Sequence, residues 1–149
     1  MNRFKKKNLL SELLSLLPKT SEFDWVEFSY AENPRATVVV ICGFGATRRS
    51  VSALRRRLLK DRYDVVLLAL QLQRTGHQGI KQMARGVRDM ILDLSQRPGP
   101  VFVVAHSAGG LIARHFMQNL EGHQLCKGFI TLATPHLGCW VPPLWANLR

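Results

Sequence analysis

The chain has 149 residues, of which 46% are hydrophobic, and this length and composition predict one globular domain with a buried core. Its formal net charge of +11 favours contact with anionic surfaces. The sequence shows no nucleic-acid motif, so we expect no nucleic-acid partner, and nothing in it predicts a metal or a cofactor. The three cysteines are scattered and odd in number, which predicts reduced thiols and a cytoplasmic location; they are Cys42, Cys126 and Cys139.

Residues 1–22 are predicted to form an N-terminal helix ahead of the domain at residues 23–149. The segment is basic and then rich in leucine, with a spacing that gives a broad apolar face ending at Pro18. A signal peptide is disfavoured because Glu12 interrupts the apolar run and no A-x-A cleavage site follows. The run is too short to span a bilayer. It either packs on the core of the domain, the commoner outcome, or lies peripherally on a membrane surface.

The rest of the chain alternates predicted strands and helices. A partly alternating stretch predicts a strand near a sheet edge at residues 23–30, and the helix at residues 80–94 has the clearest 3.6-residue period. The other predicted strands are residues 37–41, 64–70, 101–104 and 127–133, and the other helices begin near residues 48 and 111. This order predicts a parallel sheet with right-handed crossovers and helices on both faces.

The segment of residues 101–110 carries the chemistry. A buried strand is followed by Ser107, then by a predicted helix, and this is the geometry of a nucleophile elbow. The close packing of such a turn needs small residues two positions before and after the serine, and Ala105 and Gly109 stand there. The alternative interpretation is an ordinary strand-to-helix turn in which Ser107 caps the helix.

Three motifs in this order resemble the α/β-hydrolase superfamily, in its bacterial lipase and esterase branch. Residues 42–45 are similar to the HGxG loop, with Cys42 in place of the usual histidine. Residues 105–110 resemble the AHSxGG elbow of Bacillus-type lipases, and residues 132–138 resemble the TPHxG segment after the sixth strand. The resemblance implies that residues 23–149 are a partial α/β-hydrolase domain, truncated at its C-terminal side.

The resemblance also implies a serine carboxylic ester hydrolase that acts on an ester or lipid through an acyl-enzyme. Ser107 would be the nucleophile, and the backbone N–H groups of Phe44 and Ala108 would form the oxyanion hole. Because acyltransferases and thioesterases share the same elbow, the reaction class rests on the resemblance.

The catalytic acid and base of the family have no clear counterpart in this sequence. No Asp or Glu follows Glu121. His136 is the one sensible substitute base, since it leaves the sheet beside the Ser107 strand, although the matching residue of the family is not the base. The histidines considered are His77, His106, His115, His123 and His136. The alternative function is therefore a non-catalytic relative, a binding protein or an inert remnant.

Two surface features predict further partners. Arg55, Arg56 and Arg57, together with the N-terminal lysines, predict weak contact with an anionic membrane surface. The last strand, residues 127–133, has no predicted neighbour on one side and is followed by an apolar tail. An open apolar edge predicts self-association, unless the tail folds back over it.

Overall fold

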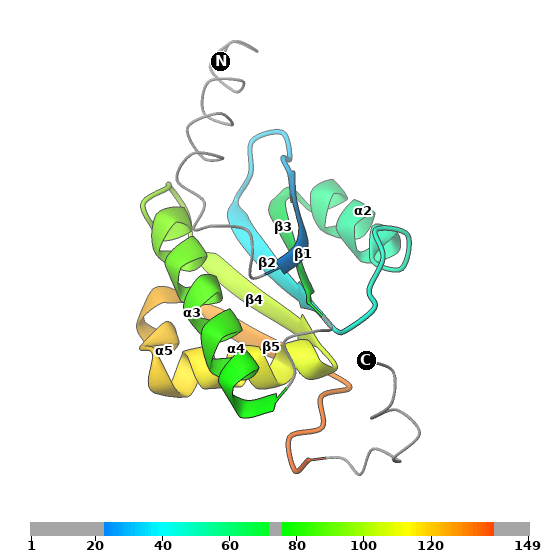
Figure 1. Cartoon of the computed structure of the whole chain (residues 1–149). Helices are drawn as coiled ribbons and strands as arrows, with labels where there is room; N and C mark the ends of the chain where they lie inside the picture. Colours follow the sequence, from blue (N-terminus) through cyan, green and yellow to red (C-terminus); the bar gives the residue numbers. More distant parts are fainter. Residues whose placement is uncertain (1–22, 72–75, 139–149) are drawn as a thin grey trace.

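The computed structural model describes residues 23–71 and 76–138 of the chain (Figure 1). Five strands form one sheet in the order β1-β3-β2-β4-β5. Their bounds are β1 (Phe23–Ser29), β2 (Ala36–Cys42), β3 (Tyr63–Leu70), β4 (Val101–His106) and β5 (Gly128–Leu132). The predicted N-terminal helix, the apolar tail and Cys139 lie outside the described residues. Within the described ranges, no helix is long and apolar enough to cross a membrane.

Strands β2 to β5 run parallel, as predicted, while β1 lies at an edge and runs antiparallel to β3. The edge position was predicted, but the direction was not. Only residues 30–35 separate β1 from β2. So short a connection stays at one end of the sheet, whereas a parallel return needs a crossover of a dozen or more residues.

Helices cover both faces of the sheet, which confirms the predicted architecture (Figure 1). Helix α2 (Ser52–Lys60) packs on one face; α3 (Gly76–Ser95), α4 (Ala108–Asn119) and α5 (Gly122–Leu125) pack on the other. Two predicted helix starts were wrong. The first helix begins at Ser52 rather than near residue 48, because Thr47 and Ser50 hydrogen-bond each other's backbone and form a turn instead. The next begins at Gly76, so His77 lies on a helix and not in a loop.

The core has one apolar cluster on each face of the sheet. Under α3 and α4 the sheet contributes Val39, Ile41 and Leu68. The predicted inward face of α3 is fully buried except at its first residue, Ile80, which is partly buried; the buried residues are Met83, Ala84, Val87, Met90, Ile91 and Leu94. The cluster under α2 is smaller, and no residue of α2 is fully buried. The α2 face is therefore the more thinly covered side of the sheet.

Helix α4 begins in close contact with β2, where a Cβ on Gly109 would lie 2.5 Å from the carbonyl oxygen of Ile41. We expect Gly109→Ala to destabilise the fold by roughly 1–3 kcal/mol, because strand backbone cannot yield to the added methyl group. The matched control is Gly128→Ala, because its Cβ would lie 3.0 Å from the ring of Phe102, and a side-chain ring can rotate away from the added methyl group. Urea denaturation followed by circular dichroism measures both. A Gly109→Ala chain as stable as wild type would contradict the close packing.

Candidate active site

Ser107 stands between β4 and α4 in a strained backbone conformation, with φ 53° and ψ −128°. Such a conformation costs a residue with a side chain about 1–3 kcal/mol and persists only where the surroundings impose it. Its hydroxyl forms no capping hydrogen bond with α4, so the capping interpretation of this serine was wrong. The turn therefore exposes the hydroxyl instead of using it to begin the helix.

Contacts from β5 and the segment after it hold this turn in place. The Ser107 N–H donates to the Leu132 carbonyl (2.9 Å), which extends the pairing of β4 with β5 by one residue. The Ser107 carbonyl accepts hydrogen bonds from the Thr134 hydroxyl (3.0 Å) and the Gly110 N–H (3.0 Å). Gly110 must lack a side chain, because a Cβ would lie 1.9 Å from Thr134 Oγ1. The segment that resembles TPHxG thus has a direct role in fixing the serine.

Ser107 opens into a pocket of ≈ 310 Å³ on the α2 face of the sheet. The glycine loop, residues 43–46, forms one wall, and a Cβ on Gly43 would lie 2.9 Å from the Cβ of Ser107. The remaining lining is mainly apolar, with polar groups from His106 and Ser50; the apolar residues are Val40, Cys42, Val51, Leu54, Val104 and Leu132. The structure therefore brings Phe44 and Ser107, two predicted site residues, to one pocket.

Ala108, the other predicted oxyanion residue, is the first residue of α4. The first N–H groups of a helix have no partner within the helix, and the helix dipole favours negative charge at this end. Phe44 lies in a turn that the Ala46 N–H closes on the Gly43 carbonyl (3.3 Å), with Gly45 at φ 70°. Glycine adopts this positive φ without strain, which allows the loop to turn sharply beside Ser107.

Cys42 stands where the HGxG loop has its histidine, and it is fully buried beneath the pocket. Burial raises the pKa of its thiol to about 11, so the side chain is neutral near pH 7. Its only polar contact among the described residues is weak, from Sγ to the Val40 carbonyl at 3.9 Å. Cys42 is accordingly part of the apolar floor and neither a nucleophile nor an ionic anchor for the loop.

His136 is not brought to Ser107. Its Nε2 lies 3.0 Å from Thr131 Oγ1, and its carbonyl accepts a hydrogen bond from Arg114 (2.9 Å), whose guanidinium also lies 3.5 Å from His136 Nδ1. His136 lines a second pocket of ≈ 300 Å³, together with Arg114 and His115. In the described part of the chain, no side chain hydrogen-bonds to the Ser107 hydroxyl. Among the described residues, His106 is the one histidine that lines the Ser107 pocket.

Sequence reasoning missed three contributors to this site. Val51 and Leu54 pack in the cluster under α2 and also line the pocket. Thr134 was noted only as part of a motif, and its hydrogen bond to the Ser107 carbonyl follows Ala133, which adopts φ 48°. For Thr134 the only available signal was the motif at residues 132–138 that contains it.

The mostly parallel sheet, with a serine turn after β4 and helices on both faces, is an α/β-hydrolase fold, and solved structures agree. The mature lipase BlEst2 of Bacillus licheniformis is 19% identical with a TM-score of 0.65, over 84% of this chain and 53% of that one. A monoglyceride lipase of Saccharomyces cerevisiae, solved with a substrate analogue, is 18% identical (TM-score 0.60; 82% and 43% covered). Est1E of Butyrivibrio proteoclasticus is 13% identical (TM-score 0.60; 76% and 50% covered). The chain thus spans about half the length of these enzymes.

The family follows from a second comparison. The model of the family described as "Putative serine esterase (DUF676)" matches residues 31–143, and the chain belongs to this family. The match includes the glycine loop, the Ser107 turn and the segment around His136. No curated protein matches the sequence.

The buried thiols predict a pH dependence of stability. Burial raises the pKa of Cys42 and of Cys126 from 9.0 to about 11. Between these values the unfolded chain loses the protons while the folded chain keeps them, so the free energy of unfolding falls as pH rises from about 9 to about 11. The fall is on the order of 1–2 kcal/mol for Cys42 and smaller for half-buried Cys126, where water screens the charge.

Urea denaturation across this pH range measures the effect against a matched variant. Replacing Cys42 and Cys126 by alanine removes the contribution of the thiols to the pH dependence. Lysines and tyrosines also titrate between pH 9 and 11, but they are the same in both chains and cancel in the comparison. A difference between the two chains that stays constant with pH would contradict buried, protonated thiols.

Proposed function

We propose that the chain carries the nucleophile and both oxyanion donors of a serine carboxylic ester hydrolase. The observation that supports this most is the Ser107 hydroxyl, held by strained backbone, unused by helix capping and placed in an apolar pocket against the glycine loop. Membership of a serine esterase family and the fold of lipases and esterases support the same reaction class.

In the proposed reaction, Ser107 Oγ attacks the ester carbonyl carbon and the carbonyl oxygen becomes an oxyanion. The backbone N–H groups of Phe44 and Ala108 stabilise it, and loss of one such donor typically costs about 3–4 kcal/mol of transition-state stabilisation. The alcohol then leaves with a proton, and water hydrolyses the acyl-enzyme. The proton of Ser107 needs an acceptor, and we propose that the acid and the base come from outside the described residues.

The substrate we propose is an ester with an uncharged, apolar acyl group. None of the residues lining the Ser107 pocket is an Asp, Glu, Lys or Arg, and Cys42 is neutral. Burying a charged acyl group there would leave its charge unpaired at a large desolvation cost. The apolar walls from α2 and β4 instead gain from excluding water around hydrocarbon.

The alternative is a non-catalytic relative that binds such a ligand without turning it over. It is favoured by one observation, namely that the described residues offer the Ser107 hydroxyl no hydrogen-bonding base. Without a base, only the weaker catalysis of the oxyanion hole and binding remains. Reactivity of the serine separates the two functions.

A fluorophosphonate probe on the purified 149-residue chain tests this proposal. Because the oxyanion hole and binding still assist attack without a base, we expect mass spectrometry to find a single, slowly formed adduct on Ser107. Ser107→Ala should abolish this labelling while melting like wild type. Ser50→Ala is the matched control, because Ser50 lines the same pocket and should leave labelling unchanged. Undiminished labelling of Ser107→Ala would contradict the assignment, and a folded wild-type chain that never reacts would favour the non-catalytic alternative.

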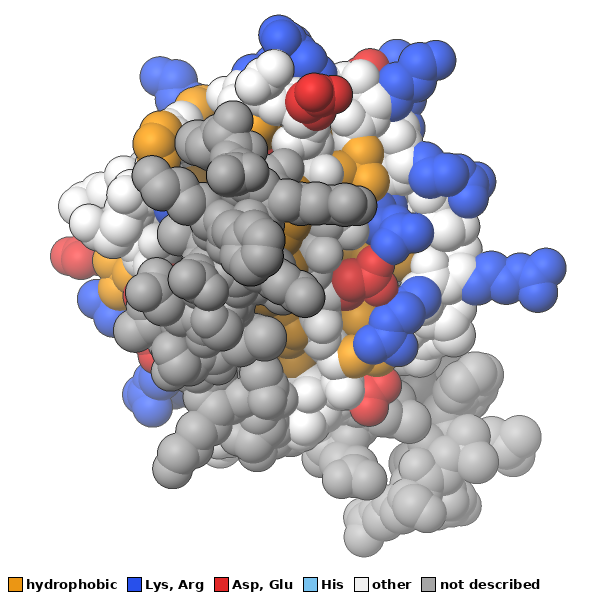
Figure 2. All heavy atoms as spheres, turned by 90° about the horizontal axis from the view of Figure 1, so that it is seen from above, with side chains coloured by type: hydrophobic (Ala, Val, Ile, Leu, Met, Phe, Trp, Pro, Cys, Tyr) orange, Lys and Arg blue, Asp and Glu red, His pale blue; other side chains and the backbone are white. Residues whose placement is uncertain are grey.

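Contact with an anionic membrane surface stays a prediction, and the structure weakens its basis. Arg55 is paired with Glu27, and Arg57 Nε lies 2.7 Å from Asp61 Oδ2, so two of the three arginines already have an acidic partner. Figure 2 shows Lys and Arg side chains spread around one end of the molecule, with Asp and Glu among them. The described surface there is a mixed one.

We also propose that the chain self-associates through β5. In the described sheet β5 pairs with β4 alone, and Ile130 and Leu132 are 58% and 44% exposed. An uncharged apolar edge with open backbone groups is a template for pairing with another strand.

Sedimentation velocity at several concentrations tests this proposal. We expect wild type to associate as its concentration rises and Ile130→Lys to stay more monomeric, because a lysine on the edge opposes pairing. Asp24→Lys, on the opposite edge strand β1, is the matched control and should behave like wild type. A wild-type monomer at every concentration would contradict the proposal.

A further inference from the structure

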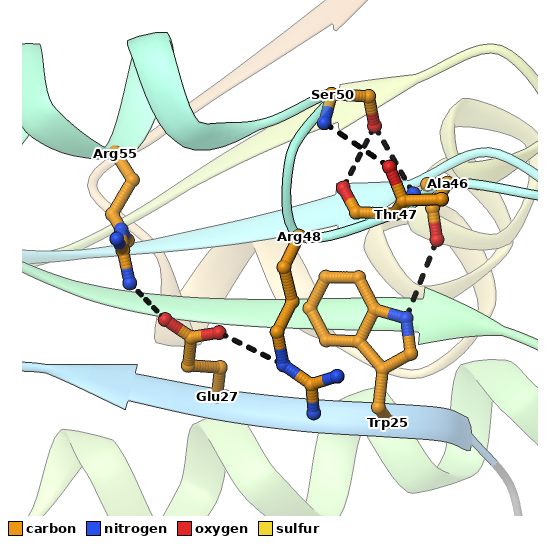
Figure 3. Close-up of polar contacts among 7 residues, drawn as sticks. All are labelled: Trp25, Glu27, Ala46, Thr47, Arg48, Ser50 and Arg55. Carbon is orange, nitrogen blue, oxygen red and sulfur yellow. Dashed lines mark hydrogen bonds and ion pairs between the residues drawn. The ribbon is translucent and has the colours of Figure 1, made fainter.

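The glycine loop beside Ser107 is contacted from two sides by different parts of the fold. At one end Gly43 packs against Ser107. At the other end the indole N–H of Trp25 donates a hydrogen bond to the Ala46 carbonyl (3.3 Å; Figure 3). Among the described residues, Trp25 is the only side chain that hydrogen-bonds to the backbone of residues 43–46. Since Cys42 provides no polar anchor for the loop, the hydrogen bond from Trp25 of β1 is the side-chain anchor among the described residues.

Trp25 reaches the loop because β1 is irregular. The pairing of β1 with β3 shifts between Phe23, opposite Leu70, and Trp25, opposite Ala69. Residues two apart on a regular strand face the same side, yet Phe23 packs in the core under α3 and Trp25 in the cluster under α2. The extra residue turns the indole to the other face, which is what bulges beside functional sites commonly do.

The indole is held in turn by a charged group from the same loop region. The guanidinium of Arg48 lies 4.9 Å from the Trp25 ring centre, and its Nε lies 3.2 Å from Glu27 Oε2 (Figure 3). Glu27 also pairs with Arg55 of α2, and its side chain is 19% exposed whereas that of Arg48 is 63% exposed. The segment between the glycine loop and α2 is therefore tied to β1 at both ends: Trp25 contacts Ala46 before it, and Glu27 contacts Arg55 after it.

We propose that Trp25 is a positioning residue that holds the glycine loop against Ser107 and so directs the Phe44 N–H into the pocket. The inference rests on the proposed function for its catalytic consequence. The loop is otherwise closed by one long hydrogen bond and contains Gly45 at positive φ, so few local forces fix its peptide planes. Oxyanion donors act only when they are held in place before the reaction.

Trp25→Phe tests the proposal, because it removes the N–H donor and keeps an aromatic ring for Arg48. Two readouts are made on the 149-residue chain: backbone hydrogen exchange of residues 43–47, and fluorophosphonate labelling of Ser107 resolved into affinity and maximal rate. We expect exchange about fivefold faster and a maximal rate about fivefold lower, as for loss of one neutral hydrogen bond, with probe affinity within about twofold of wild type.

Phe28→Leu is the matched control, because Phe28 lies on the same strand but packs on the opposite face under α3. It should cost at least as much overall stability without changing either readout. Arg48→Lys keeps the charge for Glu27 but loses the planar stacking, and it should give a smaller change of the same kind.

The outcomes separate the inference from the proposed function. Unchanged exchange of residues 43–47 in Trp25→Phe, or an equal increase in Phe28→Leu, would overturn the anchoring of the loop. Faster exchange with an unchanged maximal rate would overturn its role in positioning the donor. If wild type is not labelled at all, the proposed function fails, while hydrogen exchange still decides whether Trp25 anchors the loop.

Discussion

The structure depends on a single strained residue at the junction of β4 and α4. A serine at φ 53° and ψ −128° is stable only because its neighbours leave it no relaxed alternative. Its N–H is committed to Leu132, its carbonyl to Thr134 and Gly110, and the helix behind it is pressed against Ile41. Relaxation into an ordinary N-cap would break these contacts together, so packing and hydrogen bonding on three sides keep the hydroxyl exposed.

The pocket lies where it does for a topological reason. The chain leaves β2 through α2 on one face toward β3, and it leaves β4 through α4 on the other face toward β5. β2 and β4 are neighbours, so their following segments part in opposite directions and leave a crevice at the carboxyl ends of the strands. The glycine loop and Ser107 are the first residues of these two segments, which is why they meet although more than 60 residues of sequence separate them.

The sequence predicted well what depends on local pattern. The valine-rich runs of β2 and β4 could be recognised as central strands, although only β2 is buried on both faces and β4 is fully buried only on the face under α3 and α4. The period of α3 identified its buried face. Sequence motifs identified the glycine-loop residues that line the Ser107 pocket. The direction of β1 was missed because it is set by connection length, and the start of α2 was missed because Thr47 and Ser50 hydrogen-bond locally.

The contacts of Trp25 and His136 show why other features could not be predicted. In β1 one core face receives Phe23, Val26 and Phe28, and the other receives Trp25. This spacing follows from an irregular pairing with β3, and the strict alternation of a regular strand does not predict it. His136 leaves β5 on the expected side of the sheet, but Thr131 and Arg114 occupy its polar groups. Partners from other elements decided both orientations, and these partners are fixed only by the assembled fold.

The two halves of serine catalysis place different demands on a fold, and this chain separates them. Holding the Ser107 turn and the glycine loop is a matter of packing, and here the contacts come from β1, β2, α4, β5 and the segment after β5. Moving a proton needs a titratable group at hydrogen-bond distance from the serine. Among the described residues, no side chain makes that hydrogen bond to Ser107: His136 contacts Thr131, and the Cys42 thiol is protonated. The serine turn and the glycine loop are therefore already assembled around one pocket in a chain about half as long as the enzymes it resembles.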